Sequence, residues 1–171
     1  NNTNSTAIVI TGYQITGSRT ITRNTGSGNY YNGIGVLLAF VGESVLSADN
    51  GLYWYFRESA VVASGASLTL DPGAVVKFET GSYADGLDVR GDLTAQGTAT
   101  SPIIFTSVND GEGRTPAAGD WPHIRILSGG SGVLDHVEVR YGGRFPYSGM
   151  IYTENGSSLS LTNSVLEHSL S

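Results

Sequence analysis

The sequence contains no cysteine, which excludes disulfide bonds and thiolate metal sites. Basic residues are scarce as well, because Lys77 is the only lysine and nine basic side chains stand against fifteen acidic ones, for a net charge of −6. No cluster of cations is available to displace phosphate counterions, so nucleic acid is not expected as a partner. The longest apolar run, residues 34–41, is much shorter than the ~20 residues of a membrane span, and none is expected.

Small residues are abundant instead. The 171 residues include 24 glycines, 20 serines and 16 threonines. Glycine costs roughly 1 kcal/mol relative to alanine inside a helix and threonine is a weak helix former, whereas both are common in short strands joined by tight turns. Hydrophobic residues make up 39% of the chain, which is enough to bury a core. The composition therefore predicts an all-β globular fold.

Leucines recur at a nearly constant spacing from about residue 52 onward. Leu68 and Leu93 are 25 residues apart, and Leu134 and Leu161 are 27 residues apart. A period this short, containing about three strands, leaves no room for helical crossovers. It corresponds to one turn of a solenoid, whose parallel strands stack in register and bury apolar residues against the next turn.

A third series of short strands supports the same period. GLDVR at 86–90, HIRIL at 123–127 and GMIYT at 149–153 each alternate between two faces. The residues predicted to face inward are Leu87, Val89, Ile124, Ile126, Met150 and Tyr152. The outward row is predicted to consist of Asp88, Arg90, His123 and Arg125, continued by Ile151 and Thr153.

Four stretches carry a resemblance to a known family: VVASGASLTLDPGAVVKF at 61–78, GDLTAQGTATSPIIFTS at 91–107, GDW at 119–121 and LDHVEVRYGG at 134–143. In this order they resemble right-handed parallel β-helix (pectate-lyase-like solenoid) domains of secreted and cell-surface bacterial or archaeal proteins. The resemblance covers residues 52–171. It implies a parallel β-helix fold and an extracellular or cell-surface location more than it implies any chemistry.

Three parts of the chain do not fit the repeat: the N-terminal segment, an insertion after residue 106 and the C-terminal end. Residues 1–51 are predicted to form an N-terminal cap or a small β-rich module, since the first turn of a solenoid exposes backbone edges. Residues 107–119 exceed the period and are predicted to be an inserted loop. The turn ending at Ser171 has no evident cap, so it is expected to continue in a longer chain or to be covered by another copy, in head-to-tail self-association.

Asp88, Arg90, His123 and Arg125 are the candidate ligand-binding residues, together with Tyr147 in a predicted loop, because charged groups and aromatic faces bind sugars. Ordinary solvated charge is the alternative interpretation. No residue is predicted to be catalytic, since no outward acidic cluster persists over adjacent turns.

The inserted loop carries oxygen ligands at alternating positions, at Asn109, Asp110, Glu112 and Asp120. Such ligands can wrap a hard cation, so calcium is the one candidate cofactor, with a solvated turn as the alternative. On a second face, Glu167 is predicted to lie over Arg140 in a structural pair.

Three hypotheses of function follow. The first is a non-catalytic extracellular or cell-surface module for adhesion, surface structure or glycan contact, with polysaccharide or other surface proteins as partners. The second is the N-terminal part of a carbohydrate-active β-helix enzyme, either a polysaccharide lyase or a glycoside hydrolase. The third is a self-assembling extracellular filament subunit.

Overall fold

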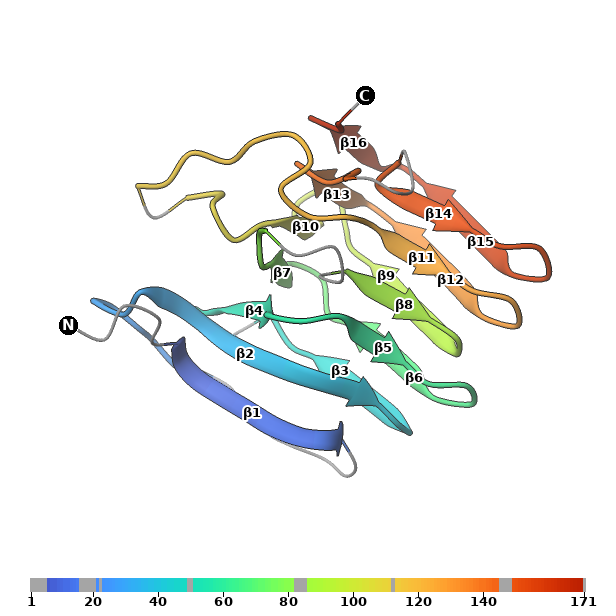
Figure 1. The fold of residues 1–171 in the computed structure, drawn as a ribbon, viewed down its shortest axis with the longest axis horizontal. Helices are drawn as coiled ribbons and strands as arrows, with labels where there is room; N and C mark the ends of the chain where they lie inside the picture. The colour runs from blue at the N-terminus through green and yellow to red at the C-terminus, as the bar shows by residue number, and fades with distance from the viewer. Residues whose placement is uncertain are drawn as a thin grey trace.

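The computed structural model describes residues 6–15, 21, 23–48, 51–81, 86–111, 113–144 and 149–170. This part of the chain is all-β, with strands throughout and no helix (Figure 1). No described segment therefore forms a helix capable of spanning a membrane.

The strands follow one another with short connections. Their bounds are β1 (Thr6–Ile15), β2 (Tyr31–Phe40), β3 (Glu43–Leu46), β4 (Tyr53–Phe56), β5 (Ala60–Val62), β6 (Ser67–Leu70), β7 (Val75–Phe78), β8 (Leu87–Val89), β9 (Asp92–Gln96), β10 (Ile103–Ser107), β11 (Ile124–Ile126), β12 (Ser131–Asp135), β13 (Val137–Arg140), β14 (Ile151–Thr153), β15 (Ser158–Thr162) and β16 (Val165–Glu167).

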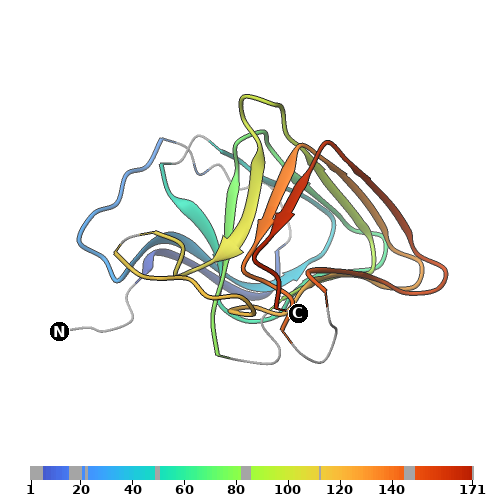
Figure 2. The ribbon, with the colours of Figure 1, turned by 90° about the horizontal axis from the view of Figure 1, so that it is seen from above.

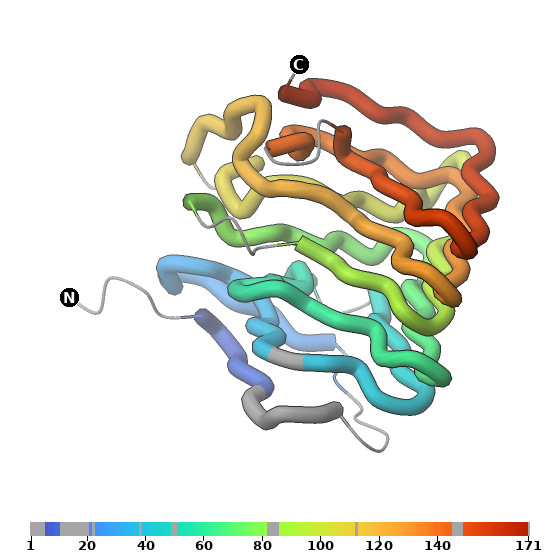
Figure 3. Tube along the Cα trace, turned by 45° about the vertical axis from the view of Figure 1, so that its right-hand side comes forward, coloured from blue at the N-terminus to red at the C-terminus, as the bar shows by residue number. Residues whose placement is uncertain are grey.

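These strands stack in three columns in which all neighbours are parallel. Column I contains β3, β6, β9, β12 and β15; column II contains β5, β8, β11 and β14; column III contains β4, β7, β10, β13 and β16. The long strand β2 pairs with β4 through its first half and with β5 through its second, so it joins columns II and III. Figure 2, which looks along the stack, shows the columns on different sides of the interior, and Figure 3 shows the turns rising from β1 to β16.

The strands of the first 51 residues belong to the same sheets as those that follow. β1 pairs with β2 in parallel, and β3 pairs with β6 at the start of column I. The hydrogen-bonded stack therefore extends from β1 through the strands of the repeat region.

The pairing register agrees with the leucine spacing. Leu68 is paired with Leu93, and Leu134 is paired with Leu161. Arg140 is likewise paired with Glu167, as the 27-residue alignment predicts. Each pair occupies the same place in consecutive turns.

The register predicted for residues 149–153 is wrong by one residue. Arg125 is paired with Tyr152, so Tyr152 continues the outward row and is 39% exposed. Ile151 is paired with the buried Ile124 and lies on the inward side. Because side chains alternate along a strand, a slip of one residue exchanges the two faces.

A row of aromatic rings runs along the buried interior. Phe40, Phe56, Phe78 and Trp121 follow one another, with ring centroids 6.0, 5.5 and 4.2 Å apart. All four side chains are fully buried. The Trp121 Nε1–H donates to the carbonyl oxygen of Arg140 at 2.8 Å, which satisfies its one polar group. Trp121 is thus part of the core.

Two inward-facing leucines of the last turn are exposed. Leu161 and Leu166 are paired in register with Leu134 and Val139, yet their side chains are 37% and 43% exposed. Among the described residues no further strand stacks on β15 or β16, so no additional turn covers these side chains. The 25- to 27-residue recurrence predicts that Leu161 and Leu166 both lie inside the column, and this prediction is wrong for the described chain.

Asp135 ties the last turn to the one before it. Its Oδ1 accepts hydrogen bonds from the Asn163 Nδ2 and the Thr162 Oγ1, both at 2.8 Å. These two bonds stabilise the ionised carboxylate and lower the pKa of Asp135 below its ordinary value.

A pH-dependent contribution to stability follows from the lowered pKa of Asp135. A depressed pKa adds stability above the unfolded-state pKa of about 3.9, and this stability disappears as the pH falls through the folded-state value. In urea denaturation between pH 7 and pH 3, Asp135→Asn is expected to be less stable than the wild type at pH 7. The difference in free energy of unfolding between the two proteins should shrink as the pH falls toward 3. A constant difference across the range would contradict the lowered pKa of Asp135.

Candidate functional site

The predicted outward row on column II contains an ion pair. The Arg125 Nε donates to the Asp88 Oδ1 at 2.9 Å, and its NH2 donates to the Asp88 Oδ2 at 2.6 Å. Both side chains are only 19% exposed, and the bidentate geometry is the strongest form of this contact. The two charges therefore satisfy each other, which makes this pair a structural clamp between β8 and β11.

The other described members of that row, Arg90 and His123, differ in exposure. Arg90 follows β8 and is exposed, whereas His123 precedes β11 and is only 6% exposed. Burial lowers the pKa of His123, and the nearby Arg125 lowers it further, which keeps the imidazole neutral at pH 7. Tyr147 lies outside the described residues. Column II thus brings Asp88 and Arg125 into direct contact, with His123 near enough for both charges to act on its pKa.

The candidate calcium ligands Asp120 and Asp110 make separate sets of hydrogen bonds. Asp120 Oδ2 accepts hydrogen bonds from the Ser107 Oγ at 2.5 Å, the backbone N–H of Ala117 at 3.2 Å and the Asn109 Nδ2 at 3.4 Å, which closes the inserted loop. Asp110 Oδ2 accepts from the Thr106 Oγ1 at 2.8 Å instead.

The fourth candidate, Glu112, lies outside the described residues. Among the residues that the structure describes, no group of three or more His, Asp or Glu side chains is arranged to hold a metal ion. Calcium is therefore not proposed.

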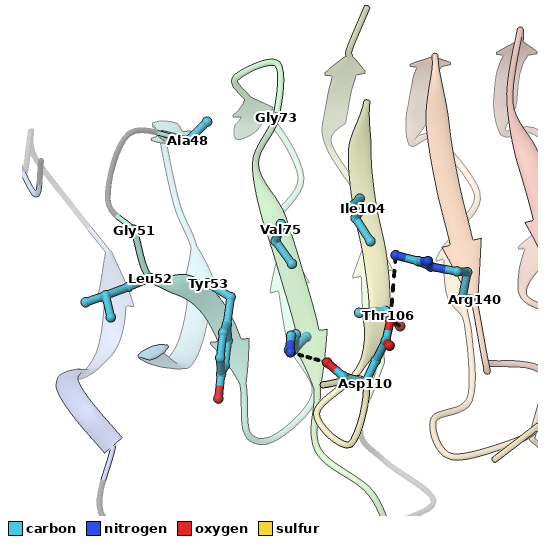
Figure 4. Close-up of a pocket in the computed structure, with 11 residues that line it drawn as sticks. Ala48, Gly51, Leu52, Tyr53, Gly73, Val75, Ile104, Thr106, Asp110 and Arg140 are labelled. Atoms are coloured by element: carbon cyan, nitrogen blue, oxygen red, sulfur yellow. Dashed lines mark hydrogen bonds and ion pairs between the residues drawn. The ribbon is translucent and has the colours of Figure 1, made fainter. Parts of the chain in front are cut away.

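The outer face of column III carries a pocket that the sequence pattern did not predict. It has a volume of about 440 Å³, within the ~300–1,000 Å³ typical of ligand sites. Val75 and Ile104, which are paired in register on β7 and β10 and partly exposed, form its apolar floor. Polar groups from three strands and the inserted loop surround this floor (Figure 4).

One polar side of the pocket is built around Lys77. Its Nζ donates to the backbone carbonyl oxygen of Asp110 at 2.5 Å and lies 4.4 Å from the centroid of the Tyr53 ring. The lysine is only 8% exposed, so these contacts hold it in a fixed position. The inserted loop thereby reaches back to β7 and contributes Asp110 to the pocket.

The opposite side is built around Arg140. Its NH2 lies 3.6 Å from the Asp110 Oδ2 and 3.7 Å from the Glu138 Oε2. Both distances exceed those of a normal N–H···O hydrogen bond, so the guanidinium is attracted by charge without being hydrogen-bonded to either carboxylate. The pocket region thus combines two cations, Lys77 and Arg140, with two carboxylates, Asp110 and Glu138.

A tyrosine cluster adjoins the pocket on the same face. The Tyr55 hydroxyl donates to the Glu79 Oε2, and the Tyr31 hydroxyl lies 3.4 Å from the Glu79 Oε1. Burial raises the pKa of both tyrosines, and the Glu79 carboxylate raises it further, so both phenols stay protonated. These rings form a second small core with Val108 of the inserted loop.

The inserted loop is fastened over this face by Arg114. Its guanidinium lies 4.7 Å from the Tyr30 ring centroid and 4.8 Å from that of Tyr31, and it donates to the carbonyl oxygens of Tyr30 and Val108. The loop after β10, yellow to orange in Figure 1, therefore folds back toward the first turns. These contacts hold the loop beside the pocket against Tyr30 and Tyr31.

A weak signal for the pocket exists in the sequence. The segments 75–78, 103–107 and 137–140 alternate apolar inward residues with outward ones, and each has a polar residue near its end. Lys77 and Thr106 are indeed paired in register. The outward position of Arg140 and its pairing with Glu167 were predicted, but not its approach to Asp110.

Comparison of the chain with protein-family models, with curated proteins and with solved structures gives no match.

Proposed function

We propose that the chain is a right-handed parallel β-helix of the pectate-lyase-like solenoid type. The three columns of parallel strands support this proposal, as does the regular return of the chain to columns III, II and I in turn. We propose further that it serves as a non-catalytic module of an extracellular or cell-surface protein, where it contacts glycans.

The pocket on column III is the observation that supports glycan contact best. Sugar rings present patches of C–H groups beside hydroxyls that both donate and accept hydrogen bonds. The pocket offers the matching surface: an apolar floor of Val75 and Ile104 with Asp110 and Arg140 at its edge. The shape is preformed, because Lys77 and Asp110 are held by contacts within the protein.

A catalytic role is less well supported by the same residues. Glycoside hydrolysis uses two carboxyl groups, one of which is protonated when it acts as the general acid. Asp110 and Glu138 instead lie beside the same guanidinium, an arrangement that suits charge pairing more than proton donation. This is the reason to propose binding in place of hydrolysis or elimination.

A glycan array probed with the whole chain tests the proposal. Retention on at least one polysaccharide is expected, without release of reducing or unsaturated sugar ends above a buffer control. If the chain binds no glycan on the array, the proposal of glycan contact is contradicted. Release of sugar ends that Arg140→Ala abolishes would establish the carbohydrate-active enzyme in its place.

A further inference from the structure

We infer that the column III pocket selects an uncharged sugar unit, bound with its C–H face on Val75 and Ile104 and its hydroxyls on Asp110 and Arg140. This inference rests on the proposed function and adds the chemical class of the ligand. Three features of the pocket carry it: its balanced charge, its unused hydrogen-bonding capacity and the shape of its floor.

The charge balance disfavours an acidic sugar. The pocket lining holds Lys77, Arg140 and the Asp110 carboxylate, and a second carboxylate, Glu138, lies 3.7 Å from Arg140 just outside the lining. Counted together these four charges balance, so no excess positive charge remains for a uronate or a sulfate. The whole chain carries a net charge of −6, which repels a polyanion at long range. An uncharged ligand escapes both penalties.

The unused hydrogen-bonding capacity suits hydroxyl groups. A carboxylate has about four acceptor positions, and within the described part of the chain the Asp110 side chain accepts one hydrogen bond, from Thr106. The Arg140 guanidinium makes no hydrogen bond to any described residue, and the side chain is 25% exposed. A sugar hydroxyl can donate to the first group and accept from the second at the same time.

The floor determines which part of a sugar is recognised. The Nζ of Lys77 lies over one face of the Tyr53 ring. That face is therefore occupied and does not serve as a stacking surface for a sugar, and Tyr53 forms a side wall of the pocket. The accessible apolar surface is therefore the aliphatic pair on β7 and β10, which are adjacent strands. A pyranose ring with a patch of axial C–H groups fits a surface of this kind.

Isothermal titration with neutral gluco-, manno- and galacto-oligosaccharides and with oligogalacturonate and oligoalginate tests the inference. A neutral oligosaccharide is expected to bind more tightly than either uronate. Its affinity should change little between roughly 0.05 and 0.5 M NaCl, because no ligand charge is screened. Tighter binding of a uronate would overturn the inference while leaving glycan contact intact.

Two variants of matched charge locate the site. Arg140→Gln removes a pocket cation, and Arg90→Gln removes an exposed cation beside column II. Arg140→Gln is expected to weaken the neutral ligand about tenfold and Arg90→Gln less than twofold, with thermal unfolding showing that both variants are folded.

A second pocket variant, Ile104→Thr, keeps a β-branched side chain and should weaken binding severalfold through the floor alone. Equal affinities of the Arg140 and Arg90 variants would place the glycan elsewhere on the chain and overturn the inference. Absence of glycan binding by the wild type would overturn the proposed function itself.

Discussion

Replacing Phe78 by alanine is expected to lower the free energy of unfolding by about 3–5 kcal/mol. Phe78 is fully buried, with the Phe56 ring at 5.5 Å on one side and the Trp121 ring at 4.2 Å on the other. Truncation removes the contacts to both rings and leaves a cavity that the hydrogen-bonded strands on either side cannot collapse to fill. Urea denaturation monitored by tryptophan fluorescence measures the loss.

Val165→Ala supplies the control for this experiment. Val165 lies in the same column but is 51% exposed, so its truncation should change the free energy of unfolding by less than about 0.5 kcal/mol. If Phe78→Ala costs no more than Val165→Ala, the aromatic row does not stabilise the stack.

Replacing Gly91 by alanine is expected to cost more than about 3 kcal/mol or to prevent folding. A Cβ at this position would lie 2.2 Å from the carbonyl oxygen of Ala66 and 2.4 Å from that of Ala63. Both atoms belong to the backbone of the preceding turn and cannot rotate away. The start of β9 would have to move off β6, breaking hydrogen bonds such as that from the Asp92 N–H to the Ala66 carbonyl oxygen at 2.9 Å.

Gly65→Ala separates this steric effect from backbone strain. Gly65 has a φ of +75°, but a methyl group added there would have no neighbouring atom within 4 Å, so alanine should cost only roughly 1–2 kcal/mol. Free energies of unfolding, or soluble yields where Gly91→Ala does not fold, give the comparison. Equal effects of the two substitutions would falsify the close approach of successive turns at Gly91.

The inward positions of the repeat were predictable from the sequence. Leu68 and Leu93, and Leu134 and Leu161, occupy paired positions because each turn must place an apolar residue over the one below it. This requirement produces a visible spacing in the sequence. Together with the composition, the spacing is enough to indicate the all-β class and the parallel stacking.

The outward positions were less predictable, because no such constraint acts on them. At 149–153 both faces carry apolar residues, so alternation alone did not distinguish Ile151 from Tyr152 as the partner of Arg125. The charged row on column II was partly predicted, but only the folded arrangement shows that Asp88 and Arg125 neutralise each other.

The amino-acid sequence by itself determined the composition, the charge and the apolar period, and with them the stack of parallel strands. Only the tertiary structure decided where the pocket lies. Lys77, Thr106 and Arg140 are 29 and 34 residues apart, since loops of unequal length intervene, so their spacing does not reveal that they line one pocket. Asp110 reaches Lys77 because the inserted loop folds back over column III, and such a path depends on contacts between distant residues that no local pattern encodes.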